Sequence, residues 1–255
     1  MSHHKIEFVN VSYSYPNGIQ AIKNVSLKIT HSESVGIIGA NGAGKSTLLL
    51  LLLGILKPDN GEIRIGDIKL TQKNIQIFRQ KIGMVFQNPD DQLFMPTVYD
   101  DIAFGPRNYF MDENEIERFV DNAMKITNIE HLKNRIAYQL SPGEKRLVAI
   151  ASVLSMNPDI LLMDEPTSFL DPQARRKIIN LINSFQHTKI ITSHDLDLIL
   201  ETCERTIILN EGKLIVDDKT TNILNNKDLL ISNKLDLPLS LSKCSACYYK
   251  LKFEK

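Results

Sequence analysis

The sequence predicts an α/β fold in which helices cover a parallel sheet, with an antiparallel β region beside it. Four short apolar segments lack the alternation of a half-exposed strand, which is typical of parallel strands buried on both faces. These segments are 34–39, 82–86, 159–163 and 189–192. Apolar residues at helical spacing in 116–123 and in 178–185 predict two helices between successive segments of this set.

The antiparallel region is predicted from apolar residues at alternate positions near the N-terminus. Residues 6–11 and 25–29 follow this pattern, and a Pro-Asn-Gly sequence at 16–18 supplies a turn between them. A later hairpin is predicted over 205–216. Residues from 225 onwards show no clear period, so the sequence assigns them to no element.

Two further signals concern helix boundaries. Asp171 followed by Pro172 is a favourable N-cap and first-turn pair for the helix around 178–185. The longest apolar run, from Leu48 to Leu56, follows a polar, glycine-rich loop and predicts a buried helix. This run is too short to span a bilayer, which takes about 20 residues.

Composition argues against several classes of protein. The 255 residues include 30 Lys and Arg and 30 Asp and Glu, so the formal net charge of zero gives no support to a nucleic-acid-binding protein. Three cysteines, Cys203, Cys244 and Cys247, do not make a disulfide framework and favour a reducing compartment. The N-terminal MSHHKIEF lacks the apolar core of a secretory signal.

The first apolar segment of the sheet ends in a glycine-rich loop, GANGAGKST. This stretch matches the phosphate-binding pattern G-x-x-x-x-G-K-[ST], and it lies between a predicted strand and a predicted helix as that pattern requires. Its backbone N–H groups and the helix N-terminus would face the phosphates of a nucleotide, with a lysine on the β- and γ-phosphates and a serine on Mg²⁺. The predicted nucleotide-binding residues are Gly39, Asn41, Gly42, Gly44, Lys45, Ser46 and Thr47.

Two adjacent carboxylates, Asp164 and Glu165, follow the apolar segment that ends at Met163. Carboxylates that emerge from a buried strand are costly to leave unpaired, and Mg²⁺ would resolve that cost. We therefore predict that Asp164 holds the metal, directly or through water. Glu165 is placed to orient or deprotonate an attacking water.

Polar residues also follow the other two apolar segments, namely Gln87 after Phe86 and His194 after Ser193. The carboxyl ends of parallel strands meet at one edge of a sheet, where ligands bind. An amide and an imidazole there could hold water, contact the metal or sense a γ-phosphate. The predicted catalytic residues are thus Gln87, Glu165 and His194, and the predicted metal ligands are Ser46, Gln87 and Asp164.

These motifs, in this order, resemble those of the ATP-binding subunits of ABC transporters, over about residues 6–218. The motifs that carry the resemblance are GANGAGKS at 39–46 (Walker A), Gln87 (the Q-loop), LSPGE at 140–144 (the signature), ILLMDE at 160–165 (Walker B), SFLD at 168–171 (the D-loop) and His194 (the switch histidine). The stretch VFQNPDDQLFMPTVYDDIAFGP at 85–106 further resembles cobalt/nickel and energy-coupling-factor (ECF) importers.

The resemblance implies a P-loop NTPase core of the RecA-like type with an antiparallel β subdomain and a helical ABC-type insert. All three would belong to a single ABC ATPase domain over 1–255. The core with its β subdomain is expected at 1–87 and 158–224, and the helical insert with the signature at 88–157. A C-terminal extension of unassigned role is expected at 225–255.

The resemblance also implies that ATP and Mg²⁺ lie between two ATPase subunits, in a homodimer or a heterodimer. Ser141 and Gly143 of one subunit would contact the nucleotide held by the other. Tyr15 would stack on adenine. Tyr13 is the competing candidate, because strand alternation places both rings on one face.

The signature departs from the usual LSGGQ at Pro142 and Glu144. Proline removes one backbone N–H, and the glutamate places a negative charge close to the expected phosphate. The Ser141 hydroxyl, the Gly143 N–H and the following helix N-terminus remain available. We therefore expect the turn to function as a phosphate contact.

In the importers that this chain resembles, two ATPase subunits drive an integral membrane coupling protein and a separate substrate-binding membrane subunit. The chain is thus expected at the cytoplasmic face of the membrane as a peripheral ATPase that powers uptake of a metal ion or vitamin, with no nucleic acid as partner. The apolar cluster at 93–96 would receive a helix of the membrane partner, and internal packing is the alternative role for that cluster.

The alternative function is a soluble ABC ATPase that acts on nucleic acid or the ribosome. Such proteins often carry two ATPase domains or a long insert, and this chain shows neither feature. The transported substrate (cobalt, nickel or a vitamin) stays open. A single Cys-Ser-Ala-Cys at 244–247 and the His3-His4 pair are weak metal signals and do not decide it.

Overall fold

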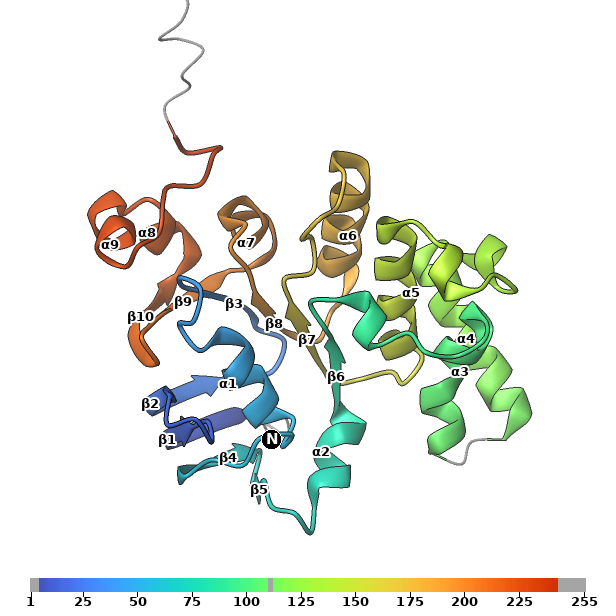
Figure 1. Cartoon of the computed structure of the whole chain (residues 1–255), viewed down its shortest axis with the longest axis horizontal. Helices are drawn as coiled ribbons and strands as arrows, with labels where there is room; N and C mark the ends of the chain where they lie inside the picture. The colour runs from blue at the N-terminus through green and yellow to red at the C-terminus, as the bar shows by residue number, and fades with distance from the viewer. Residues whose placement is uncertain (1–4, 110–111, 243–255) are drawn as a thin grey trace, which may run out of the picture.

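The computed structural model describes residues 5–109 and 112–242 of the chain. Two sheets and the helices that pack on or beside them make up this part, as Figure 1 shows. Cys244, Cys247, His3 and His4, which the sequence offered as weak metal signals, lie outside the described residues.

The larger sheet has six strands in the order β10-β9-β3-β8-β7-β6. Its strands are β3 (Ser34–Ile38), β6 (Ile82–Val85), β7 (Ile160–Asp164), β8 (Thr188–Thr192), β9 (Arg205–Asn210) and β10 (Lys213–Lys219). The four apolar segments predicted as parallel strands are β3, β8, β7 and β6, and they are neighbours in parallel pairing. Only β10 runs antiparallel, as the predicted hairpin partner of β9.

The smaller sheet is antiparallel, in the order β2-β1-β4-β5. Its strands are β1 (Ile6–Ser14), β2 (Gln20–Ile29), β4 (Asn60–Ile65) and β5 (Ile68–Lys69). The β1–β2 pair confirms the predicted antiparallel strands, whereas the sequence did not predict β4 and β5. The helix α1 (Lys45–Leu52) buries its leucines in a core shared by both sheets. It ends at Leu52, so the predicted helix is shorter than the apolar run.

The face of the larger sheet that lies away from α1 is covered by helices. These are α6 (Pro172–Ser184), α7 (Leu196–Thr202), α8 (Thr220–Leu224) and α9 (Lys227–Ser232), and they share a second core with the sheet. Asp171 caps α6 by accepting hydrogen bonds from the N–H groups of Gln173 and Ala174, both at 2.9 Å, which confirms the predicted helix start. The helix α9 lies in the segment from residue 225 onwards that the sequence left unassigned, and α8 ends directly before that segment.

A separate group of helices lies to one side of the larger sheet and has its own apolar core (Figure 1). It consists of α3 (Val98–Asn108), α4 (Glu113–Thr127) and α5 (Pro142–Leu154), with short 3₁₀ turns η1 (Pro89–Asp91), η2 (Glu130–Leu132) and η3 (Ala137–Gln139). The short helix α2 (Ile75–Lys81) leads into β6. The domain boundaries given above stay predictions.

No helix within residues 5–109 and 112–242 is both long and apolar enough to cross a membrane.

Candidate nucleotide site

The loop between β3 and α1 requires glycine at two positions. Gly44 has a φ of +104°, and a Cβ there would lie 2.6 Å from the carbonyl oxygen of Ala21. A Cβ on Gly39 would lie 2.3 Å from the carbonyl oxygen of Leu209. Gly44 is also the N-cap of α1, and in the part of the chain that the structure describes no side chain caps that helix. The first N–H groups of α1 therefore remain available to an anion.

Lys45 places a buried cation over this loop, with only 7% of the residue exposed. Its Nζ donates hydrogen bonds to the carbonyl oxygens of Gly39 at 2.8 Å and Ala40 at 3.3 Å, and it lies 3.3 Å from His194 Nε2. Burial lowers the pKa of Lys45, and the charges of Glu165 and Asp164 partly offset that effect. A phosphate oxygen would relieve the desolvation by pairing with the ammonium group.

Most of the sequence-predicted residues line one cavity of about 370 Å³. Those residues are Tyr15, Asn41, Gly42, Gly44, Lys45, Ser46, Thr47, Gln87, Asp164, Glu165 and His194. Gly39 does not line this cavity, and it is required because the Leu209 carbonyl oxygen leaves no room for a Cβ there. Within the described residues, the lining of this cavity includes neither Ser141 nor Gly143. A single chain thus brings together all predicted site residues in this cavity except Gly39 and the signature pair.

The two tyrosines occupy different environments. Tyr15 lines the cavity, and its hydroxyl lies 3.0 Å from Thr47 Oγ1. Tyr13 is 9% exposed and belongs to the core under Tyr15, with the rings edge to face at 5.1 Å. The structure therefore offers the Tyr15 ring, rather than the Tyr13 ring, to a ligand in the cavity.

Glu165 has a left-handed backbone, with a φ of +48°. Such a conformation costs about 1–2 kcal/mol outside glycine, and here the Glu165 N–H is held by the carbonyl oxygen of Thr192 at 3.0 Å. The carboxylate accepts hydrogen bonds from Ser193 Oγ at 3.1 Å and from the His194 N–H at 3.2 Å. Its other oxygen lies 3.3 Å from His194 Nε2. This strained turn aims a buried carboxylate at His194 and the cavity.

Asp164, Ser46 and Gln87 contribute a carboxylate, a hydroxyl and an amide to the same cavity. Asp164 is buried at the end of β7 and accepts a hydrogen bond from Thr192 Oγ1. Hard oxygen donors, with one or two carboxylates completed by phosphates, suit Mg²⁺. The described residues contain no group of three His, Cys, Asp or Glu side chains that could hold a metal by themselves. The donor set therefore fits Mg²⁺ bound together with a phosphate.

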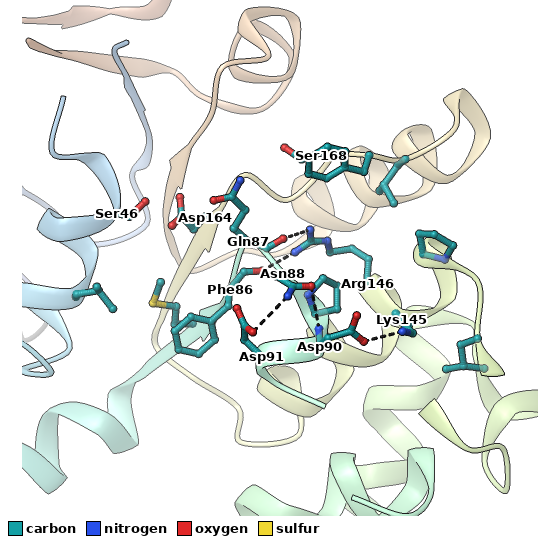
Figure 2. Close-up of a pocket in the computed structure, with 17 residues that line it drawn as sticks. Ser46, Phe86, Gln87, Asn88, Asp90, Asp91, Lys145, Arg146, Asp164 and Ser168 are labelled. Carbon is teal, nitrogen blue, oxygen red and sulfur yellow. Dashed lines mark hydrogen bonds and ion pairs between the residues drawn. The ribbon is translucent and has the colours of Figure 1, made fainter. Parts of the chain in front are cut away.

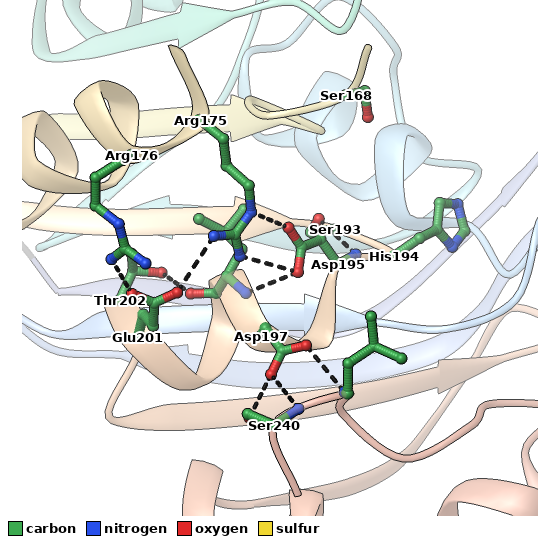
Figure 3. Close-up of polar contacts among 12 residues, drawn as sticks. Ser168, Arg175, Arg176, Ser193, His194, Asp195, Asp197, Glu201, Thr202 and Ser240 are labelled. Carbon is green, nitrogen blue, oxygen red and sulfur yellow. Dashed lines mark hydrogen bonds and ion pairs between the residues drawn. The ribbon is translucent and has the colours of Figure 1, made fainter. Parts of the chain in front are cut away.

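The loop that carries His194 is anchored by ion pairs that the sequence did not reveal (Figure 3). Arg175 on α6 reaches both carboxylate oxygens of Asp195, at 2.7 and 3.2 Å, and also Glu201 Oε1 at 3.3 Å. Asp195 in turn caps α7 by accepting from the Leu198 N–H at 2.9 Å. The helix that follows the D-loop is thus tied to the backbone beside His194.

The signature stretch forms the start of α5. Ser141 is the N-cap, and its hydroxyl accepts from the Glu144 N–H at 3.3 Å while the Glu144 carboxylate accepts from the Ser141 N–H at 2.8 Å. Pro142 occupies the first helical position, where a missing N–H costs nothing. The Ser141 N–H holds the pKa of Glu144 below its usual range. Glu144 therefore completes a capping box with Ser141, and Pro142 fits the first helical position beside it.

The apolar cluster at 93–96 divides into buried and exposed parts. Leu93 is 8% exposed and packs inside the helical group, whereas Phe94 is 64% exposed. Phe94 lies edge to face on Phe104 of α3, which is 41% exposed, with ring centroids 4.9 Å apart. The carboxylate of Asp101 accepts from the N–H groups of Phe94 and Met95, both at 3.0 Å. Internal packing thus accounts for Leu93 but not for the Phe94–Phe104 pair.

Known proteins share these features. The ABC transporter family model matches residues 22–168. A Geobacter sulfurreducens protein, named provisionally as an ABC transporter ATP-binding protein, is 53% identical over 97% of this chain and 99% of its own length. The ECF transporter ATP-binding protein EcfA of Carboxydothermus hydrogenoformans is 42% identical over 92% of this chain and 87% of its own.

Two solved structures are also similar. CbiO1 of Clostridium perfringens, described as part of the ABC transporter complex cbiONQ, is 38% identical, with a TM-score of 0.80 over 90% of this chain and 94% of that one. The dimeric post-hydrolysis structure of the cassette MJ0796, with ADP and Pi, is 31% identical, with a TM-score of 0.77 over 84% and 98%. The chain therefore belongs to the ABC transporter family, as an ATPase related to the ATP-binding subunits of ECF transporters.

Proposed function

We propose that this ATPase is the energy-supplying subunit of an importer of the ECF or cobalt/nickel class. The observation that carries the ATPase chemistry is the single cavity lined by Lys45, Asp164, Glu165 and His194. The observation that supports a membrane partner is the exposed Phe94–Phe104 pair, which follows the Q-loop. The relatives named as ECF ATP-binding proteins support the importer class.

In this proposal ATP occupies the cavity. The free N–H groups of α1 and the ammonium of Lys45 bind the phosphates, and the Tyr15 ring stacks on adenine. Ser46, Gln87 and Asp164 would hold Mg²⁺, which neutralises charge on the β- and γ-phosphates.

Hydrolysis depends on the group around Glu165. Its buried carboxylate orients a water molecule for in-line attack on the γ-phosphorus and accepts a proton from it, while the bond from that phosphorus to the bridging oxygen breaks and ADP leaves. The contacts with Ser193 and the His194 N–H hold this carboxylate in place. His194 lies 3.3 Å from both Lys45 Nζ and a Glu165 oxygen, so its imidazole is placed to respond to the γ-phosphate.

A second ATPase subunit completes the site. Ser141 and Gly143 do not line the cavity of their own chain, and they sit at an exposed helix start. We propose that they contact the nucleotide of a partner subunit, in a homodimer or a heterodimer. ATP then favours the closed dimer, because its contacts with both subunits exist only there.

The membrane partner would bind at the Phe94–Phe104 pair as a helix seated against an apolar surface. The chain would then act at the cytoplasmic face of the membrane as a peripheral subunit. Partner membrane subunits would choose the cargo, a metal ion or a vitamin.

The test is co-purification followed by transport. The tagged chain, extracted from membranes in mild detergent, should bring integral membrane subunits that mass spectrometry identifies. Reconstituted in liposomes, the complex should take up Co²⁺, Ni²⁺ or a vitamin only with ATP. Phe94→Ser should lose the membrane subunits while the free ATPase rate is retained, and Ile77→Ser, at an exposed apolar residue of α2, is the matched control. Salt-sensitive binding to nucleic acid without membrane subunits would contradict the proposal.

A further inference from the structure

Arg146, in the second turn of α5, is a buried cation that the chemistry above does not use. The residue is 1% exposed. Its two terminal nitrogens donate hydrogen bonds of 2.6 Å to the carbonyl oxygens of Phe86 and Gln87. Figure 2 shows the guanidinium inserted against the backbone at Gln87. Within the described residues it forms no ion pair with a carboxylate, and its Nε has no hydrogen-bond partner.

Burial of this charge is costly for the fold. Desolvation lowers the pKa of Arg146 to about 10, against an opposing effect of the nearby Asp164 charge. An apolar residue of similar length would avoid this cost if packing were the only requirement. The planar, two-pronged guanidinium matches a different requirement, since it can hold two successive carbonyl oxygens at once.

Two further contacts tie the segment 86–92 to α5. The side-chain oxygen of Gln92 accepts from the Phe86 N–H at 3.2 Å, and its amide nitrogen donates to the carbonyl oxygen of Ala149 at 2.7 Å. Lys145 forms an ion pair with Asp90 at 2.6 Å. The carbonyls of Phe86 and Gln87 are therefore held directly by Arg146 of α5, and the Phe86 N–H is held indirectly, through Gln92.

We propose that Arg146 is a positioning residue that locks the Q-loop backbone to the signature helix, so that Gln87 and the Ser141–Gly143 turn move as one unit. Contact of the turn with a partner's nucleotide would thereby set Gln87 in its own cavity. A second cavity, of about 550 Å³, separates this unit from Asp164 and from the 168–170 segment, which leaves room for the movement (Figure 2). The inference rests on the role proposed for Gln87 in hydrolysis.

A double-mutant cycle on the full chain tests this lock. Arg146→Met removes the guanidinium group. Gln87→Ala removes the side chain that Arg146 is proposed to position, and the double variant combines both changes. ATP affinity is measured by titration with a fluorescent nucleotide, kcat by phosphate release, and folding by thermal unfolding. Ser155→Ala is the matched control, because it removes a buried hydrogen bond at the C-cap of α5, from Ser155 Oγ to the Ile102 carbonyl oxygen at 2.8 Å, that involves neither Phe86 nor Gln87.

Arg146→Met should lower kcat by about tenfold or more, with ATP affinity changed by less than about twofold, since the phosphate loop is untouched. In the Gln87→Ala background it should cost less than about twofold more, because the group it positions is already absent. Ser155→Ala should keep the wild-type kcat. Arg146→Lys should keep most of the defect, since a point charge cannot hold both carbonyls. If Arg146→Met fails to fold, the cycle is run with Arg146→Lys.

Equal losses of kcat from Arg146→Met in both backgrounds would overturn the inference, and so would full activity of Arg146→Lys. Those outcomes leave the proposed function intact. A Gln87→Ala variant with wild-type kcat would instead overturn the role of Gln87 in that function, and the inference with it. The two failures are therefore distinguishable.

Discussion

The chain has two helix starts that are proposed to meet ATP, and they are built in opposite ways. The start of α1 has Gly44 as N-cap, no side-chain cap and no acidic residue in its first turn. The start of α5 has Ser141 as N-cap, a capping box with Glu144, and Pro142 in its first turn. The first helix leaves its N–H groups to a ligand, whereas the second satisfies part of its own.

This difference indicates a division of labour. An uncapped helix start beside a buried lysine is costly without an anion, so it is the place where a nucleotide gains most from binding. A self-capped start is stable alone and gains less from a phosphate. We therefore expect ATP to bind first at α1 of one subunit, and the α5 start of the partner to add a weaker contact that decides whether the dimer closes.

Glu165→Gln should have the largest effect of the variants that compare the two helix starts. Because this variant should hydrolyse ATP only slowly, the nucleotide should stay bound between the start of α1 and the partner's start of α5. Loss of the general base should lower turnover by about 10²–10⁴-fold, while ATP affinity is retained. Dimers formed with ATP should persist longer on a sizing column. Glu117→Gln, at an exposed carboxylate of α4, is the control. Unchanged turnover would remove Glu165 from its proposed role.

Lys45→Ala tests the α1 side alone. The loss of a charged hydrogen-bond donor to phosphate is worth about 1.5–3 kcal/mol, so ATP affinity should fall by roughly 10- to 150-fold. Nucleotide titration measures the change, and Lys213→Ala, at an exposed lysine of β10, should bind ATP normally. A variant that keeps both affinity and ATPase activity would contradict the phosphate role of this loop.

Pro142→Gly tests whether the start of α5 functions as a nucleotide contact with proline at position 142. Proline at the first helical position removes an N–H that the helix does not need, so restoring it should change the ATPase rate by less than about tenfold, or about 1.4 kcal/mol. Pro172→Gly, at the corresponding position of α6, controls for backbone flexibility. A much larger gain in rate would show that this signature is impaired and would favour a dimer of two different subunits.

Glu144→Gln should have the smallest effect, confined to stability and its pH dependence. The folded pKa of Glu144 lies below its usual value of 4.5, so the folded state binds fewer protons than the unfolded state near that pH. The charge of Glu144 therefore stabilises the fold above about pH 4.5, and this contribution is lost as the pH falls through the folded pKa.

Urea midpoints of the wild type and Glu144→Gln, measured at several pH values, check this effect. The wild type should be slightly more stable near neutral pH, and the gap should close in acid. A gap that is constant with pH would show that the capping box does not depend on the carboxylate charge.

The sequence predicted the strands and motifs that depend on local pattern. Segments such as 34–39 and 159–163 are apolar on both faces, and only parallel strands inside a sheet need that pattern. The polar residues after them converge because the carboxyl ends of the strands share an edge. Strand alternation could not decide whether Tyr13 or Tyr15 lines the cavity, because β1 ends at Ser14 and its register shifts there.

Contacts between distant segments were also beyond the sequence. Arg146 occupies the apolar stripe of α5 with Ala149, Ile150 and Val153, and a charge at such a position was the available signal. That signal could not reveal that Arg146 donates hydrogen bonds to the carbonyl oxygens of Phe86 and Gln87. The short helices α8 and α9 have too few turns to show a period.

The burial of β3 has a consequence for how fast different parts of the backbone unfold locally. All five of its residues are buried, and it is paired on both sides, by β8 and β9. Amide hydrogens of such a strand exchange with solvent mainly through global unfolding, whereas the exposed start of α5 can open locally. Hydrogen–deuterium exchange should therefore be slowest beside the phosphate loop and faster at Ser141. The phosphate loop after β3 would keep its conformation when the nucleotide binds, whereas the start of α5 would change its conformation on contact with the partner subunit.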